Sequence, residues 1–373
     1  MILVYGVSIV YFLFMVVLLI LSLFVNIKAS TKQLFFLFSL SALSLGFIAF
    51  GTFPNEGSDL SRYYVELENM RQGGLDYVNE NSLYKNTILT NFLFYAVSLT
   101  DTNNLLPFFS TVLTFLIFSY VVIKETKKYN IKSSVLSLFI LTFFSIIFFR
   151  AFLTGIRQHL ALSIMLLAIY RDFIENKKDF KTILIYLIPL LIHVGTIPII
   201  IIRMLYYLFK GKIYKMKYLL LFWTALIPFI SIILVNTNSY FSFIYEKLIN
   251  YQDNDYPDMR LYIILIIFLF VILLIAKIVS NEKKLLVEFK LVNYTKFYIL
   301  LLIFTVGSIN IHHLFSRMLS FSVYMLLPLL FVFYKVIDKR FKPLFTGLIL
   351  FLIIGLFIYQ LIDAKTSWRL LLN

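Results

Sequence analysis

The sequence has 373 residues, of which 61% are hydrophobic and only 14% are charged, and its mean hydropathy is +0.90. Soluble domains carry roughly 25% charged residues, so this composition excludes a water-soluble enzyme and indicates a membrane protein. The chain has no cysteine, which excludes disulfides, thiolate nucleophiles and cysteine-ligated metal sites. We attribute the net charge of +15 to the basic cytoplasmic loops expected of a membrane protein, and not to nucleic-acid binding.

Apolar segments of spanning length recur along the whole chain, since about 20 apolar residues cross a bilayer as a helix. We expect about ten spans, at residues 3–25, 34–53, 105–123, 133–149, 151–170, 218–235, 261–279, 297–311, 314–334 and 344–362. The first has no basic n-region and no small-residue cleavage site, so we interpret it as a retained span and not as a signal peptide. The predicted fold is an all-α, polytopic transmembrane helix bundle that forms a single integral-membrane domain over residues 1–373.

The polar connections differ in charge, and this predicts the orientation of the bundle. Lysine- and arginine-rich connections stay in the cytoplasm. The basic connections are 27–33, 124–132, 171–181, 203–217, 277–296 and 335–343. The acidic connections 54–86 and 236–260 are therefore expected to be outer loops, with both termini outside.

Two apolar segments do not fit as simple spans. Residues 87–100 are too short, and we expect an interfacial or re-entrant helix at the outer face. Residues 182–209 lie between two basic connections and are interrupted by Gly195 and two prolines, which break helices. We predict a re-entrant hairpin of two half-helices whose tip, around His193, points outward. Broken backbone at membrane depth is tolerated only inside protein or beside a wet cavity.

The arginines are distributed differently from the lysines. Under this topology most lysines are cytoplasmic, whereas seven of the ten arginines lie on the outer side. The planar guanidinium grips phosphate with two hydrogen bonds, and within an apolar helix it usually faces a cavity or a partner. We therefore expect an outer site for a phosphate-bearing ligand, with the candidates Arg62, Arg150, Arg157, Arg260 and Arg317. Snorkelling into lipid headgroups is the alternative, above all for Arg150 and Arg260.

Four short motifs follow one another along roughly residues 40–335. Residues 57–63 (GSDLSRY) fit G-x-D-x-x-x-Y, and residues 156–161 (IRQHLA) fit I-R-Q-x-x-A. Residues 193–196 (HVGT) approximate H-x-S/T with glycine in place of the serine, and Arg317 opens an R-x-x-x-Y region whose tyrosine is displaced to Tyr324. In type and order these motifs resemble those of the EpsG family of Wzy-type polymerases of exopolysaccharide, capsule and O-antigen.

The resemblance implies a glycosyltransferase of the bacterial cytoplasmic (inner) membrane whose active site faces outward. It would transfer an undecaprenyl-diphosphate-linked glycan to the non-reducing end of another lipid-linked repeat. Its partners would be the lipid-linked donor and acceptor, membrane lipids and a chain-length regulator, with no cofactor and no nucleic acid. Two alternatives stay open. An O-antigen ligase-like glycosyltransferase usually carries a large outer domain late in the chain, and a flippase or transporter usually shows an inverted repeat and charge near the midplane.

The expected chemistry assigns roles to the candidate residues. Negative charge develops on the diphosphate as the glycosidic bond breaks, and preorganised cations stabilise it. Arg157 and Arg317, with Arg150, are the candidates for binding the diphosphate. No aspartate pair with metal-ligand spacing is evident, so we predict a metal-independent enzyme.

The acceptor hydroxyl needs a base, and the candidates are His193, Asp59, His312 and His313. We prefer His193 because a hairpin tip would place its imidazole inside a cavity, although a structural hydrogen-bonding role is the alternative. Asp59 could equally orient Arg62 or Arg157 through a salt bridge. The further substrate-binding candidates are Arg62, Tyr63, His312, His313 and Arg260. The tyrosines of the outer loops, Tyr84 among them, could stack on sugars or form an interfacial aromatic belt.

Overall fold

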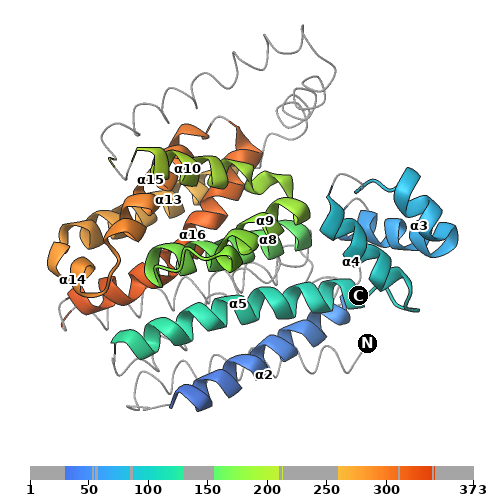
Figure 1. Ribbon diagram of the computed structural model, residues 1–373, viewed down its shortest axis with the longest axis horizontal. Coiled ribbons are helices and arrows are strands. Elements are labelled where there is room, and N and C mark those ends of the chain that lie inside the picture. The colour runs from blue at the N-terminus through green and yellow to red at the C-terminus, as the bar shows by residue number, and fades with distance from the viewer. Residues whose placement is uncertain are drawn as a thin grey trace, which may run out of the picture. The chain divides into compact units, whose positions relative to one another are not determined.

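The structure is a computed structural model that describes residues 30–52, 54, 58–84, 87–129, 155–209, 212, 259–309, 311–337 and 340. Across these ranges all regular structure is helical (Figure 1), which confirms the all-α prediction there. Within the described residues, three helices are long and apolar enough to cross a membrane, at Thr31–Phe50, Leu105–Lys128 and His313–Val336. The expected spans 3–25, 133–149, 218–235 and 344–362 lie outside the described residues, so the count of ten spans stays a prediction.

The described helices form two compact units. The first contains the described residues of Met1–Ala168, Lys178–Val194 and Ile337–Asn373, and the second contains those of Ile169–Lys177 and Gly195–Val336. That both units belong to a single integral-membrane domain stays a prediction. The expected outer loop 236–260 lies almost entirely outside the described residues.

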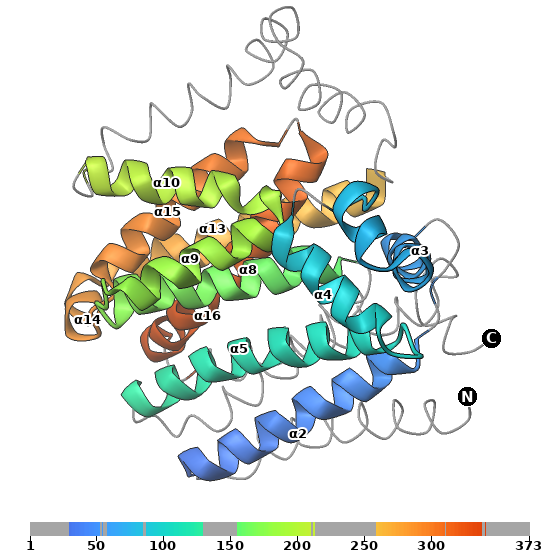
Figure 2. The same cartoon turned by 45° about the vertical axis from the view of Figure 1, so that its right-hand side comes forward.

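In the first unit, helices α2 (Thr31–Phe50) and α5 (Leu105–Tyr129) lie side by side (Figures 1 and 2). Ser30 begins α2 with a reciprocal cap, in which its hydroxyl accepts from the backbone of Gln33 and the Gln33 side chain accepts from the backbone of Ser30. Gly46 permits the close approach of the two helices, because a Cβ at this position would collide with the side chain of Val112. Small residues at such crossings are typical of membrane helices.

The predicted outer loop 54–86 is largely helical, which its acidic composition did not predict. Helix α3 (Asp59–Glu80) starts at the N-cap Ser58 and is kinked at Gly74, whose φ is 58°. Its buried residues recur at helical spacing, so one face is covered while the rest is solvated. They are Leu60, Tyr63, Glu66, Leu67, Met70 and Val78. The short apolar segment 87–100 forms α4 (Ile88–Ser98), and α3 packs on it. The helix expected at 87–100 is confirmed, whereas its place at the outer face stays a prediction.

The expected break within 182–209 is also present. Helix α8 (Ile156–Ile169) runs into a single π-turn, and helix α9 (Phe180–Ile192) starts at the N-cap Asp179. His193 ends α9 in an extended conformation, and a 3₁₀ turn leads into α10 (Ile197–Leu208). Helix α9 packs on α4, and α10 packs on α15. The two half-helices therefore belong to different units, and their re-entrant arrangement in the membrane stays a prediction.

The second unit is built around helix α16 (His312–Val336), against which α13 (Met259–Asn281) and α15 (Val292–Gly307) pack (Figure 2). The short helix α14 (Lys283–Glu288) joins α13 to α15. The buried hydroxyl of Tyr294 on α15 donates a 2.7 Å hydrogen bond to the carbonyl of Met325 on α16. This bond ties the two helices in the turn before Pro328.

Candidate functional site

Arg157 lies in the first turn of α8, and its guanidinium is held by two tyrosine rings. The guanidinium carbon is 4.0 Å from the ring centre of Tyr84 and 5.3 Å from that of Tyr63. Its Nε donates a long hydrogen bond, 3.4 Å, to the Tyr63 hydroxyl. Among the described residues, its two Nη groups have no hydrogen-bond partner and it forms no ion pair. Aromatic rings hold this cation in place, and no described carboxylate neutralises it. Its Nη donors are therefore available to bind an anion.

The two tyrosines are themselves fixed by packing. Tyr63, Tyr84 and Phe94 form three edge-to-face pairs with ring centres 5.1–5.9 Å apart, an arrangement that aromatic rings prefer. These residues belong to a cluster that also contains Ile156, the residue before Arg157. The packing of α3 and α4 therefore determines where the guanidinium of Arg157 lies.

Both tyrosines are neutral at physiological pH. Burial raises the pKa of Tyr84 to about 12, against the opposing effect of the Arg157 charge. Burial also raises the pKa of Tyr63, and Arg157 again acts in the opposite direction. Because neither ring carries a phenolate charge, the positive charge of Arg157 is not cancelled by the residues that hold it.

The turn that carries Tyr84 is fixed by buried polar groups. Glu66 is fully buried, and its carboxylate accepts a 2.9 Å hydrogen bond from the backbone N–H of Leu83. The Ser82 hydroxyl accepts from the backbone N–H of Tyr84 at 3.1 Å and donates to Asn91 at 2.7 Å. Buried polar groups that are satisfied in this way specify one backbone conformation. This network holds the Tyr84 ring against Arg157.

Asp59 and Arg62, both singled out by the sequence, pair with each other. Their side chains form an ion pair one turn apart at the start of α3, and they are 46% and 66% exposed. Asp59 also lies in the first helical turn, where the helix dipole favours a carboxylate. The structure thus shows the salt-bridge alternative for Asp59 with Arg62 as its partner, and not with Arg157.

Arg71 is another arginine of the predicted outer side, and its contacts are those of a structural residue. Its Nε donates to the carbonyl of Ser98 at 3.2 Å, and an Nη donates to the carbonyl of Thr100 at 2.8 Å. Its guanidinium also pairs with Glu68 at 2.6 Å. The hydrogen bond from Arg71 is the main cause of the lowered pKa of Glu68. Arg71 therefore caps the end of α4 and is fully engaged, in contrast to Arg157.

His193 is connected to this part of the molecule through the residue before it. The buried hydroxyl of Thr90 on α4 donates a 2.7 Å hydrogen bond to the carbonyl of Ile192, a group that the end of α9 leaves without a helical partner. Ile192 also packs with Leu160 on α8, one turn after Arg157. The end of α9 at His193 is thus fixed against both α4 and α8.

The other candidate residues fall elsewhere. Arg317 and His313 lie partly buried on α16 in the second unit, and a meeting of Arg157 and Arg317 at one site stays a prediction. Arg150 lies outside the described residues, as do the side chains of Arg260 and His312. Within the part of the chain that is described, no group of three or more histidine, aspartate or glutamate side chains could hold a metal ion.

The second unit contains another arginine that contacts aromatic rings, but this arginine is also paired with a carboxylate. The guanidinium carbon of Arg203 on α10 is 4.8 Å from the ring centre of Phe173, and its Nε donates to Asp172 at 2.5 Å. Asp172 is buried and lies in the π-turn Tyr170–Ile174. The charge of Arg203 is therefore neutralised within its own unit, which indicates a structural role.

Apart from Tyr63, the sequence did not single out the residues that support Arg157. Tyr84 was one of many tyrosines, and Glu66 and Thr90 carried no motif. The helical spacing of Leu60, Tyr63 and Leu67 could have revealed the buried face of α3, since a stripe of this kind predicts an amphipathic helix. The pairing of that helix with the start of α8 depends on tertiary contacts between residues 94 positions apart.

Comparison with known proteins identifies the chain at the level of a family. No curated protein and no solved structure matches it. The model of the EpsG family, by contrast, matches residues 35–372, nearly the whole chain. The matched region contains all four motifs, including the Tyr63 and Arg157 that the structure brings together. The chain is therefore a membrane protein that belongs to the EpsG family, a family of Wzy-type polysaccharide polymerases.

Proposed function

We propose that this protein polymerises lipid-linked oligosaccharide repeat units on the outer face of the bacterial cytoplasmic membrane. The donor is a glycan on undecaprenyl diphosphate, and the acceptor is the non-reducing sugar of a second lipid-linked repeat. The observation that carries the proposal is the guanidinium of Arg157, which Tyr63 and Tyr84 hold while its Nη groups have no partner among the described residues. A guanidinium with an available donor fork is suited to bind phosphate oxygens with two hydrogen bonds, which supports the proposal.

The reaction follows from the chemistry of the leaving group. An acceptor hydroxyl attacks the anomeric carbon of the donor, the bond between that carbon and the diphosphate oxygen breaks, and its electron pair moves onto the diphosphate. Arg157 binds the diphosphate oxygens and stabilises the charge that develops there, with Arg317 and Arg150 as further cations. Because the rings already hold Arg157, little reorganisation is needed as the bond breaks.

We assign His193 as the general base that accepts the proton of the acceptor hydroxyl. The hydrogen bond from Thr90 to the carbonyl of Ile192 fixes the backbone on which the imidazole is carried. A base must be held within hydrogen-bond reach of the hydroxyl it deprotonates, and a fixed helix end supports this. Asp59 is a less suitable candidate, since its carboxylate is already engaged in an ion pair with Arg62.

The test is glycan chain length in a deletion strain complemented with Arg157→Lys. Lysine keeps the charge but loses the planar fork and the stacking geometry. We expect long polymer to disappear, with single lipid-linked repeats accumulating at the outer face of the membrane. The amount of protein in the membrane and its elution as one species in detergent serve as the control for folding. Wild-type chain lengths in this variant would refute the arginine mechanism.

The same deletion strain separates the alternatives. Repeats trapped on the cytoplasmic side would favour a flippase. Long polymer that forms normally but is not delivered to its final acceptor would favour an O-antigen ligase-like enzyme. Unpolymerised repeats that reach the outer face are the outcome expected of a polymerase.

A further inference from the structure

The second unit contains an apolar groove between α13 and α15 that plays no part in the proposed reaction. Its volume is about 370 Å³, which is within the range of ligand pockets. Six of its eight lining residues carry only hydrocarbon side chains: Leu273, Ala276, Ile299, Leu302, Ile303 and Val306. The other two are Lys277 and Ser280. The groove is thus apolar along its length and polar in one place.

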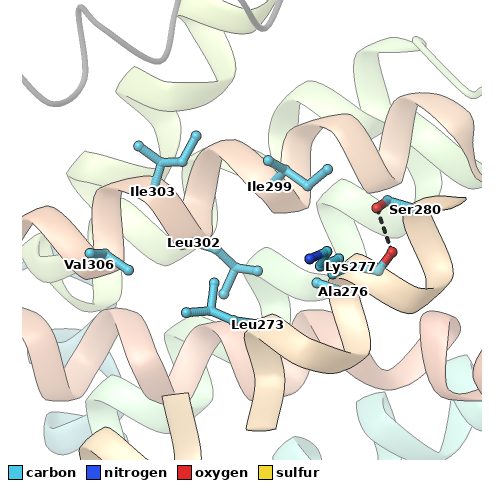
Figure 3. Close-up of a pocket in the computed structure, with 8 residues that line it drawn as sticks. All are labelled: Leu273, Ala276, Lys277, Ser280, Ile299, Leu302, Ile303 and Val306. Carbon is cyan, nitrogen blue, oxygen red and sulfur yellow. Dashed lines mark hydrogen bonds between the residues drawn. The ribbon is translucent and has the colours of Figure 1, made fainter. Parts of the chain in front are cut away.

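The polar atoms gather at one end of the groove. Figure 3 shows Lys277 and Ser280 at the end of α13, with Val306 of α15 at the opposite end. Ser280 donates its hydroxyl proton to the carbonyl of Lys277 at 2.9 Å, so the helix itself satisfies this hydroxyl. Lys277 is exposed and forms no ion pair with any described carboxylate. A cation at the mouth of a hydrocarbon groove complements a molecule with one anionic end and one apolar end.

The residues around Lys277 favour the binding of an anionic group on the cytoplasmic side of the membrane. Helix α13 leads at this end into α14 and into the basic connection 277–296, which the positive-inside rule places in the cytoplasm. Further lysines follow closely in this segment, at Lys283, Lys284 and Lys290. Anionic lipids of the inner leaflet attract such segments, and basic pockets between membrane helices bind their headgroups.

We propose that this groove is a binding site for an anionic glycerophospholipid of the cytoplasmic leaflet. One acyl chain lies between α13 and α15 against Leu302 and Ile303, and the phosphate accepts a charge-assisted hydrogen bond from the ammonium of Lys277. The lipid-linked donor of the proposed reaction has its diphosphate on the outer face, so its charged end would not meet Lys277. The groove is therefore assigned to a resident lipid and not to the substrate.

The test is the lipid content of the full-length protein purified in mild detergent, measured by native mass spectrometry and by extraction of the bound lipid. We expect wild-type protein to retain phosphatidylglycerol or cardiolipin in preference to phosphatidylethanolamine. Lys277→Ala should reduce this retention several-fold, and Lys277→Arg should preserve it. Lys283→Ala removes an equal charge outside the groove and is expected to bind as the wild type does.

A second pair of variants tests the apolar part. Ile303→Trp fills the groove and should lower retention several-fold, whereas Ile263→Trp adds the same ring to an exposed position of α13 and should not. Equal retention in all variants, or equal retention of charged and zwitterionic phospholipids, would overturn the proposal. Retention of a polyisoprenyl phosphate instead would assign the groove to the substrate. Since binding is measured without glycan, its failure would leave the polymerase proposal untouched.

Discussion

The guanidinium carbon of Arg157 lies 4.0 Å from the ring centre of Tyr84, although the two residues are 73 positions apart in the chain. The contact joins the start of α8 to the turn after α3. Tyr63 approaches the same guanidinium, and its hydroxyl accepts a hydrogen bond from it. The position of the cation therefore depends on the folding of the helices between the first two described membrane-span candidates.

Tyr84→Ala should lower polymerisation more than Tyr84→Phe. A cation–π contact contributes roughly 0.5–2 kcal/mol, or about 2- to 30-fold in an equilibrium constant, and alanine removes the ring altogether. Phenylalanine keeps the ring, and the Tyr84 hydroxyl forms no hydrogen bond among the described residues. The measurement is the rate of chain extension in membranes normalised to the amount of protein. Equal rates in the two variants would mean that the ring does not position Arg157.

Thr90→Val should destabilise the protein, because it leaves the buried carbonyl of Ile192 without its donor. An unsatisfied buried acceptor costs roughly 1–3 kcal/mol, and valine matches threonine in shape. Thr90→Ser keeps the hydroxyl and is the matched control. Thermal unfolding in detergent gives the stability, and chain extension tests whether the end of α9 at His193 has moved. A valine variant as stable and as active as the serine variant would contradict this role for Thr90.

Arg203→Lys should behave differently from Arg157→Lys, although both arginines contact aromatic rings. Arg203 pairs with the buried Asp172. Lysine keeps the charge but loses the planar fork and the stacking on Phe173, so the cost should be smaller than the roughly 3–5 kcal/mol of removing one partner of a buried pair. We expect less folded protein and a lower unfolding temperature, with normal chain lengths from the protein that remains. Loss of long polymer at wild-type protein levels would instead place Arg203 in the reaction.

Raising the pH should weaken the cluster around Tyr84. Its pKa in the folded protein is about 12, above the ordinary value of 10.0, mainly because of burial. A raised pKa in the folded state means that this contribution to stability is present below about pH 10 and is lost as the pH rises to about 12. Thermal unfolding between these two values should show the decline, and Tyr84→Phe should reduce its slope. An identical slope in both proteins would show that another group causes it.

Much of the architecture followed from local pattern. The hydropathy of residues 34–53, 105–123 and 314–334 predicted the helices now seen as α2, α5 and α16, because a long apolar run has few structures in which it satisfies its backbone. The two prolines and the glycine of 182–209 predicted a broken helix, since proline removes a donor. The helix in 54–86 was missed because this segment was predicted to be a loop from its net charge alone. The amphipathic spacing of its apolar residues, which indicates a helix, was not considered.

The motifs identified Arg157 and Tyr63 as separate candidates, and residue chemistry alone marked the arginine for phosphate binding. The sequence could not distinguish an arginine that is fully engaged, such as Arg71, from one whose donors are available, because this depends on which carbonyls and carboxylates lie nearby after folding. Composition and local spacing determine that this is a membrane protein and where its helices lie, because hydropathy and helix formation depend on residues that are close in sequence. Only the tertiary structure decided that two tyrosine rings, and no described carboxylate, meet Arg157, because residues distant in sequence supply that environment.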